Sequence, residues 1–115
     1  MGKITTHILD TTQGAPAAGV EIRLYAIRDE RERVAFAVSN ADGRTEKPLL
    51  EAAAMITGTY ELEFDIGDYF SRSGAAVGEP AFLDIVVIRF SVNADEHYHV
   101  PLLCSPWSYS TYRGS

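Results

Sequence analysis

The C-terminal segment 97–115 constrains the fold of this chain more than any other segment. It begins with His97-Tyr98-His99-Val100-Pro101-Leu102-Leu103-Cys104, and Ser105-Pro106 separates this run from a second one that ends at Ser115. Successive side chains of a β-strand point to opposite faces. One face of the first run is therefore apolar: Tyr98, Val100, Leu102 and Cys104. The opposite face carries His97, His99, Pro101 and Leu103. If Ser105-Pro106 forms a turn, the two runs are antiparallel strands, and the end of the chain lies close to the two histidines.

The same alternation recurs along the chain and predicts an all-β protein. Segment 3–10 has Ile4, Thr6 and Ile8 on one face and Thr5, His7 and Leu9 on the other. Further strands are expected at 20–27, 33–39, 58–65 and 82–92, with turns rich in Gly, Pro and Asp between them. Segment 68–73 predicts one short helix capped by Asp68, and the Ala-rich segment 49–55 is a weaker candidate for a helical turn. Short strands separated by turns at this spacing favour a β-sandwich.

Length, charge and cysteine content limit the classes of function. A chain of 115 residues is expected to form a single domain over residues 1–115 with its own core. Its net charge of -6 argues against a nucleic acid or an anionic membrane as partner. The single cysteine cannot form an intrachain disulfide, and no apolar stretch reaches transmembrane length. We therefore expect a cytoplasmic protein in which Cys104 is a small core residue rather than a nucleophile.

Three polar residues stand out from the strand pattern. His7 and His99 lie on the non-core faces of their strands, and Arg44 follows the turn Asn40-Ala41-Asp42-Gly43. Each also has a plainer interpretation, because strand histidines are usually hydrogen-bonded structural residues and an arginine after a turn is usually solvated. A zinc site formed by the chain's three histidines is a weak alternative, since His-x-His is a poor signal alone. Apolar residues on the histidine face predict contact with another subunit: Leu9, Pro101 and Leu103.

Three motifs in order along the chain add a family to this interpretation. They are Ile4-Thr5-Thr6-His7-Ile8-Leu9-Asp10-Thr11, Asn40-Ala41-Asp42-Gly43-Arg44-Thr45, and His97-Tyr98-His99-Val100-Pro101-Leu102-Leu103 with the terminal Tyr112-Arg113-Gly114-Ser115. Together they resemble the 5-hydroxyisourate hydrolases, the transthyretin-like proteins of urate breakdown, over essentially the whole chain. The ending Tyr-Arg-Gly-Ser is the signature of that family.

The resemblance implies a prealbumin/transthyretin-like β-sandwich of two four-stranded sheets with one short helix. It also implies a homotetramer whose active sites lie in a channel between dimers. His7, Arg44 and His99 match the catalytic residues of the family, and His7, Arg44, Tyr112 and Ser115 match its substrate-binding positions. No metal or organic cofactor is implied.

The implied reaction is the hydrolytic opening of a ring amide in 5-hydroxyisourate. In this hypothesis one of His7 and His99 deprotonates water and the other orients it or returns the proton, while Arg44 binds the planar ring and stabilises negative charge. Which histidine is the base stays open. Two other classes remain as alternatives: a transthyretin-like carrier of a small aromatic ligand, and a β-sandwich interaction module.

Overall fold

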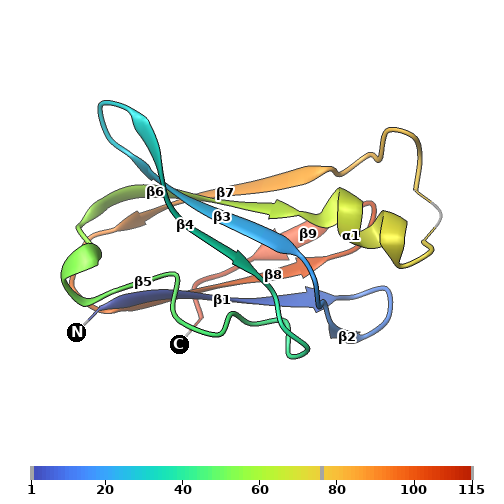
Figure 1. Cartoon of the computed structure of the whole chain (residues 1–115), viewed down its shortest axis with the longest axis horizontal. Coiled ribbons are helices and arrows are strands. Elements are labelled where there is room, and N and C mark those ends of the chain that lie inside the picture. The colour runs from blue at the N-terminus through green and yellow to red at the C-terminus, as the bar shows by residue number, and fades with distance from the viewer. Residues whose placement is uncertain (1, 76, 115) are drawn as a thin grey trace.

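The structure, a computed structural model, describes residues 2–75 and 77–114 and has two β-sheets packed face to face (Figure 1). The first sheet has the order β2 (Ala15–Pro16), β1 (Lys3–Asp10), β8 (His97–Cys104), β9 (Tyr109–Thr111), and β5 (Leu50–Glu51) also pairs with β1. The second sheet has the order β4 (Arg31–Val38), β3 (Glu21–Ile27), β6 (Gly58–Asp65), β7 (Ile85–Val92). The predicted sandwich is confirmed. The described residues form five strands in the first sheet, rather than the four expected, because two two-residue strands, β2 and β5, both pair with the edge of β1 opposite β8.

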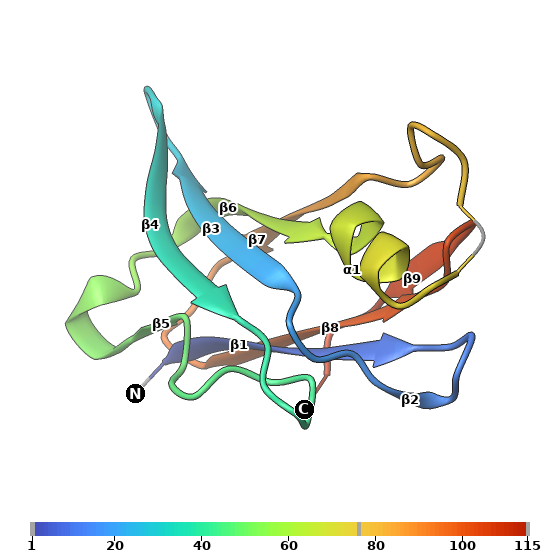
Figure 2. The ribbon, with the colours of Figure 1, turned by 45° about the vertical axis from the view of Figure 1, so that its right-hand side comes forward.

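Strand pairing in the first sheet carries the features that matter for function. β1 and β8 are parallel, whereas β8 and β9 are antiparallel and joined by the predicted turn, in which Ser105 N–H donates to the backbone oxygen of Ser108 at 2.9 Å. The segment 43–51 runs along the free edge of β1 in both ribbon views (Figures 1 and 2), and Leu49 N–H donates to the backbone oxygen of Ile4 at 2.8 Å. Its contacts with β1 extend from Ile8, which Gly43 contacts, to Lys3, which pairs with Glu51.

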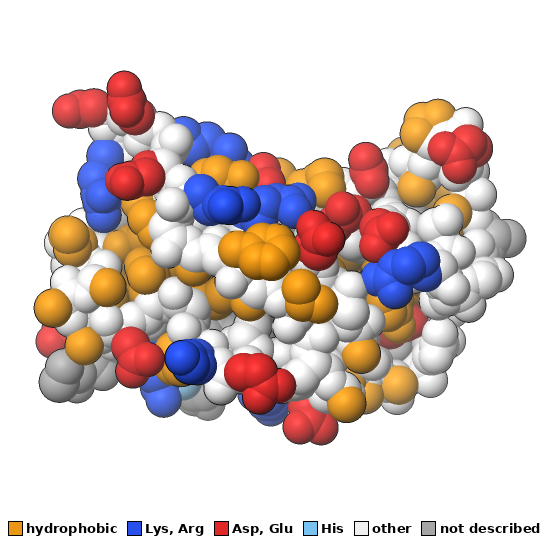
Figure 3. Space-filling view, in the orientation of Figure 1, with side chains coloured by type: hydrophobic (Ala, Val, Ile, Leu, Met, Phe, Trp, Pro, Cys, Tyr) orange, Lys and Arg blue, Asp and Glu red, His pale blue; other side chains and the backbone are white. Residues whose placement is uncertain are grey.

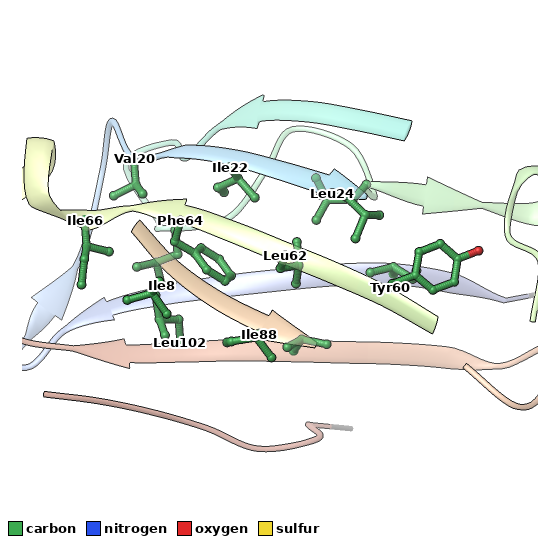
Figure 4. Packing of buried hydrophobic residues seen from close by; sticks show 14 of the residues in the cluster. Ile8, Val20, Ile22, Leu24, Tyr60, Leu62, Phe64, Ile66, Ile88 and Leu102 are labelled. Carbon is green, nitrogen blue, oxygen red and sulfur yellow. The ribbon is translucent and has the colours of Figure 1, made fainter. Parts of the chain in front are cut away.

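The core lies between the sheets and follows the predicted alternation. Figure 4 shows side chains from both sheets meeting there: Ile8 and Leu102 from the first, and Ile22, Leu24, Leu62, Phe64 and Ile88 from the second. Cys104 is 1% exposed, and burial raises the pKa of its thiol to about 12. The cysteine is therefore a core residue, as predicted. Thr6 is buried with its hydroxyl donating to the backbone oxygen of Val100 at 2.7 Å, so this polar core residue is satisfied.

The helix and two neighbouring boundaries differ from the sequence expectation. The helix α1 (Ile66–Arg72) begins two residues earlier than predicted, and its cap is Asp65 rather than Asp68. The Asp65 carboxylate accepts from the backbone N–H of Asp68 at 3.3 Å. The predicted strand 82–92 begins only at Ile85, because the backbone oxygen of Asp84 accepts from Gly67 of the helix instead of a strand. The expected helical turn is present as a short 3-10 helix (Ala52–Ala54).

The end of the sandwich that carries α1 and β2 lies opposite the tip of the β3–β4 hairpin (Figures 1 and 2). Basic, acidic and apolar side chains lie together over β3 and β4 (Figure 3). Among the described residues, no helix has the length and apolar character needed to cross a membrane.

Candidate functional site

The parallel pairing of β1 with β8 aligns the polar faces of the two strands. Thr5 lies beside His99 and Lys3 beside His97, and His7 follows on the same face of β1. All five side chains are exposed or half-buried, whereas the residues that alternate with them on β1 are buried. The alternation that builds the core therefore also delivers this polar surface.

The hydroxyl of Thr5 lies between two imidazoles of β8. Its Oγ1 is 2.7 Å from Nε2 of His97 and 2.8 Å from Nδ1 of His99, and both distances are hydrogen bonds. The two rings have centroids 6.0 Å apart and planes inclined at 61°. The three side chains form one connected polar group on the surface of the sheet.

A tight turn holds Arg44 at the edge of this surface. The side-chain oxygen of Asn40 accepts from the backbone N–H groups of Asp42 at 2.9 Å and Arg44 at 3.1 Å. Gly43 has φ +75° and its backbone oxygen accepts from the N–H of Ile8 at 2.8 Å. A Cβ atom on Gly43 would overlap the carbonyl oxygen of Ile8, so glycine is required here for both conformation and space. The turn thereby fixes Arg44 next to β1.

These elements enclose a pocket of about 350 Å³. Thr5, His97 and His99 contribute to one side, and segment 44–48 forms the other. Three basic side chains and one acidic side chain line it: Lys3, Arg44, Lys47 and Glu46. The pocket is therefore polar and electropositive, which suits a small ligand rich in carbonyl oxygens or one that acquires negative charge.

The electrostatics keep the imidazoles neutral. Burial lowers the pKa of His99, and the charges of Arg44, His97 and His7 lower it further. Burial together with Lys3 and Arg113 also lowers the pKa of His97. Because an imidazole ordinarily titrates at about 6.5, both rings are mostly uncharged at neutral pH and able to accept a proton.

The C-terminal tail packs against the same histidines, as the sequence predicted. Gly114 forms a bridge with His99, its N–H donating to the backbone oxygen of His99 at 2.7 Å. The guanidinium of Arg113 donates to the backbone oxygen of His97 at 3.2 Å and lies 4.1 Å from the centre of the Tyr98 ring. The tail therefore helps to hold His97 and His99 of β8 in position beside the pocket.

The predicted site residues are only partly brought together. Arg44 and His99 line the pocket, and His7 lies close enough for its charge to act on His99. Tyr112 is 61% exposed and borders a different groove, between β7 and β8, together with Phe90. Ser115 lies outside the described residues. Pro101 was expected to contact a partner subunit. This expectation is wrong for the single chain, in which Pro101 is already buried.

Two contributors were not singled out by the sequence. Thr5 shares the face of His7, so alternation placed it correctly. The sequence did not predict which strand pairs with β1, and therefore did not show that Thr5 lies beside His99. His97 was expected only to share a strand face with His99, and the structure links the two rings through Thr5. Among the described residues, no group of three or more His, Cys, Asp or Glu side chains is arranged to hold a metal ion. The zinc interpretation therefore finds no cluster in residues 2–75 and 77–114.

The fold and the pocket define a two-sheet β-sandwich protein with a polar small-molecule site built on its β1–β8 surface. The chain belongs to the HIUase/Transthyretin family, whose model matches residues 4–114. It is 53% identical to 5-hydroxyisourate hydrolase 2 of Rhizobium meliloti, over 99% of this chain and 97% of that protein.

Two solved structures are similar along nearly the whole chain. The 5-hydroxyisourate hydrolase of Klebsiella pneumoniae has a TM-score of 0.84 and 37% identity, with 100% of each chain covered. Sea bream transthyretin in complex with thyroxine has a TM-score of 0.87 and 27% identity, covering 97% of this chain and 94% of that one. The family contains both an enzyme and a ligand-binding protein, so the residues of the pocket must decide between them.

Proposed function

We propose that this protein is a 5-hydroxyisourate hydrolase that opens a ring amide of its substrate to give 2-oxo-4-hydroxy-4-carboxy-5-ureidoimidazoline. The observation that carries the proposal is a half-buried, neutral His99 in one electropositive pocket with Arg44. The name of the Rhizobium meliloti relative, at 53% identity along the chain, supports the same reaction. The pocket volume of about 350 Å³ lies in the range of sites for small molecules.

Hydrolysis of an amide needs a base for water, a partner for the developing oxyanion and an acid for the leaving nitrogen. In our proposal His99 takes the proton from water, because its lowered pKa keeps the ring neutral near pH 7. Arg44 donates to the planar substrate and stabilises the oxyanion, a role for which its permanent charge and forked donors are suited. His7 orients the water or returns the proton.

The direct test follows the ultraviolet absorbance of 5-hydroxyisourate generated from urate by urate oxidase. Added protein is expected to accelerate the decay well beyond the spontaneous rate, and an unchanged rate would remove the assignment. Replacing His7, His99 or Arg44 by alanine is expected to lower kcat by about 10²-fold or more. The matched control is Arg28→Ala, because Arg28 lies on the β3–β4 turn and pairs there with Glu32.

A carrier of a small aromatic ligand is the second candidate, because sea bream transthyretin binds thyroxine on the same fold. The charged lining of the pocket favours hydrolysis over storage of an apolar ligand. Calorimetry with thyroxine separates the two: tight binding without hydrolysis of 5-hydroxyisourate would favour the carrier.

The expected homotetramer is also a proposal. Leu9 and Leu103 are aligned on the pocket face of the β1–β8 sheet and are only half-buried in one chain. A second protomer on this face would cover them and close the pocket. In that assembly Tyr112 and Ser115 remain proposed substrate-binding residues. Light scattering measures the mass, and a monomer would contradict the assembly. We further propose a cytoplasmic location, supported by the buried free thiol of Cys104.

A further inference from the structure

Thr5 has one hydroxyl proton but two imidazole neighbours. Its Oγ1 lies 2.7 Å from Nε2 of His97 and 2.8 Å from Nδ1 of His99, so both contacts are hydrogen bonds of ordinary length. A hydroxyl donates one hydrogen bond and accepts up to two. The two ring nitrogens therefore cannot both be acceptors from Thr5. The protonation of one ring constrains the protonation of the other.

Two arrangements use the hydroxyl proton in this bridge. In the first, Nδ1–H of His99 donates to Thr5, and Thr5 donates to Nε2 of His97. In the second, Nε2–H of His97 donates to Thr5, and Thr5 donates to Nδ1 of His99. In a neutral imidazole only one nitrogen carries hydrogen. The first arrangement therefore requires the Nδ1–H tautomer in both rings, and the second requires the Nε2–H tautomer in both.

We propose that Thr5 is a positioning residue that holds His97 and His99 in the same tautomer and so sets whether Nε2 of His99 acts as base or acid. This inference rests on the proposed hydrolase function. With both rings in the Nδ1–H form, Nε2 of His99 has a free lone pair, and among the described residues it has no hydrogen-bond partner in the protein. With Nε2 protonated, the same atom is a proton donor. One bridge thus supports both halves of the reaction.

The proton movements balance over one turnover. Nε2 of His99 takes a proton from the attacking water while Nδ1–H of His99 passes its proton to Thr5. The original hydroxyl proton of Thr5 moves to Nε2 of His97. His99 is then neutral with Nε2 protonated, and His97 is the imidazolium. The reverse movements deliver the proton from Nε2 of His99 to the leaving nitrogen, which restores all three groups and leaves His7 to orient the water. The net transfer is from water to that nitrogen.

The surroundings of the two rings favour this division of charge. A positive charge on His99 would be half-buried and would face Arg44 from the turn and His7 from β1. His97 is exposed, so water can solvate its imidazolium, although Lys3 of β1 and Arg113 of the tail oppose it. Two acidic groups also belong to these surroundings: Glu46 lines the pocket, and Glu96, which precedes His97, pairs with Arg113 at 2.9 Å.

Histidine NMR on the wild-type protein tests the tautomers without using activity. With ¹⁵N-labelled histidine, long-range proton–nitrogen correlations identify which nitrogen carries hydrogen in each neutral ring. We expect His97 and His99 to share one tautomer at pH 8. Opposite tautomers would show that both nitrogens donate to Thr5, and this result would overturn the proposal. The measurement stands even if the protein does not hydrolyse 5-hydroxyisourate.

Kinetics with Thr5→Val then tests the consequence for catalysis. Valine has the shape and strand preference of threonine but lacks the hydroxyl. We expect kcat to fall by about 10-fold or more with KM within about 2-fold, because a proton-transfer step is impaired and binding is not. Thr5→Ser retains the hydroxyl and should recover most of kcat. The matched control is Thr59→Val, at a strand position in the other sheet, which should leave kcat unchanged.

A double variant connects Thr5 to His97. If His97 acts through the hydroxyl, Thr5→Val combined with His97→Ala should lose no more activity than the more damaging single change. Additive losses would show that the two residues act separately. A Thr5→Val protein with wild-type kcat would also overturn the proposal. A shared tautomer in a wild-type protein that does not hydrolyse 5-hydroxyisourate would support the Thr5 bridge and contradict the proposed function.

Discussion

The N–H of Gly114 donates to the backbone oxygen of His99 at 2.7 Å, and a Cβ atom on this glycine would lie 2.6 Å from Cδ2 of the His99 ring. The tail therefore packs against the imidazole at a distance that only glycine permits. This contact gives a physical reason for glycine within the terminal Tyr-Arg-Gly-Ser, because Gly114 packs directly against a pocket histidine.

Gly114→Ala is expected to displace the His99 ring and lower kcat by about 10- to 100-fold, since small misplacements of a catalytic group are costly. Global stability should change little, because Gly114 lies outside the core. Turnover and thermal unfolding measured together check this expectation. Gly74→Ala is the control, because nothing lies within 4 Å of a Cβ atom at Gly74. The positive φ of Gly74 means that this substitution should affect stability rather than activity. Wild-type turnover in Gly114→Ala would contradict the packing role.

Arg44→Lys tests whether the forked guanidinium matters beyond its charge. Lysine preserves the charge but cannot make two parallel hydrogen bonds to a planar substrate. We expect kcat/KM to fall by at least about 10-fold, with a smaller loss than in Arg44→Ala. Arg44 is exposed, and its turn is held by its own backbone N–H donating to the side-chain oxygen of Asn40, so a change of the Arg44 side chain should leave unfolding unaffected. Equal activities for the lysine and wild-type proteins would show that charge alone is sufficient.

The charge of Arg44 also predicts how His99 titrates. Burial first, and then Arg44, lower the pKa of His99, so Arg44→Met should raise it. An NMR titration of the three histidines measures this shift, and an unchanged pKa would refute the coupling. In the wild-type protein, kcat/KM should fall as acid protonates His99, with a midpoint below the ordinary histidine value.

The lowered pKa of His99 also determines how folding stability depends on pH. The unfolded chain binds protons at His99 at a higher pH than the folded chain does, because the folded-state pKa is lowered. Folding stability from this group is therefore complete above the unfolded pKa of about 6.5 and declines as the pH falls below it. The decline stops below the folded-state pKa. Chemical denaturation at several pH values measures the slope, and greater stability in acid would contradict the direction.

The sequence predicted the strands well because their local alternation and their burial agree. Alternation puts Tyr60, Leu62 and Phe64, for example, on one face of the strand expected at 58–65, and all three are at most 1% exposed. The helix cap was assigned wrongly, because Asp65 and Asp68 both suit a cap and only the path of the chain out of β6 selects Asp65. Strand β7 is shorter than predicted because tertiary contacts of Asp84 with the helix outweigh alternation.

The site was less accessible to sequence reasoning than the fold. Faces follow from alternation, so His7 and His99 were placed correctly on polar faces. The parallel register of β1 and β8, which brings Thr5 beside His99, depends on pairing between segments about ninety residues apart and leaves no local signal. The position of Arg44 depends likewise on the contact of Gly43 with Ile8.

A buried acid at the other end of β1 supports the last prediction. The hydroxyl of Tyr69 in α1 donates to the carboxylate of Asp10 at 2.8 Å, and Asp10 is 1% exposed. Burial and this hydrogen bond raise the pKa of Tyr69 to about 12. The other carboxylate oxygen accepts from the backbone N–H groups of Thr12 at 2.9 Å and Gln13 at 3.3 Å. The pair ties the helix to β1.

Tyr69→Phe should destabilise the fold by about 1–3 kcal/mol, because it leaves a buried carboxylate oxygen without its donor. Tyr109→Phe is the matched control, since Tyr109 is 45% exposed and its change should alter stability little. Urea denaturation at one protein concentration measures both. Activity per folded molecule should be unchanged, because Asp10 lies five residue positions along β1 from Thr5, a distance of about 17 Å. A Tyr69→Phe protein that is as stable as the wild type would show that water replaces the hydroxyl and that the helix is held by its apolar contacts alone.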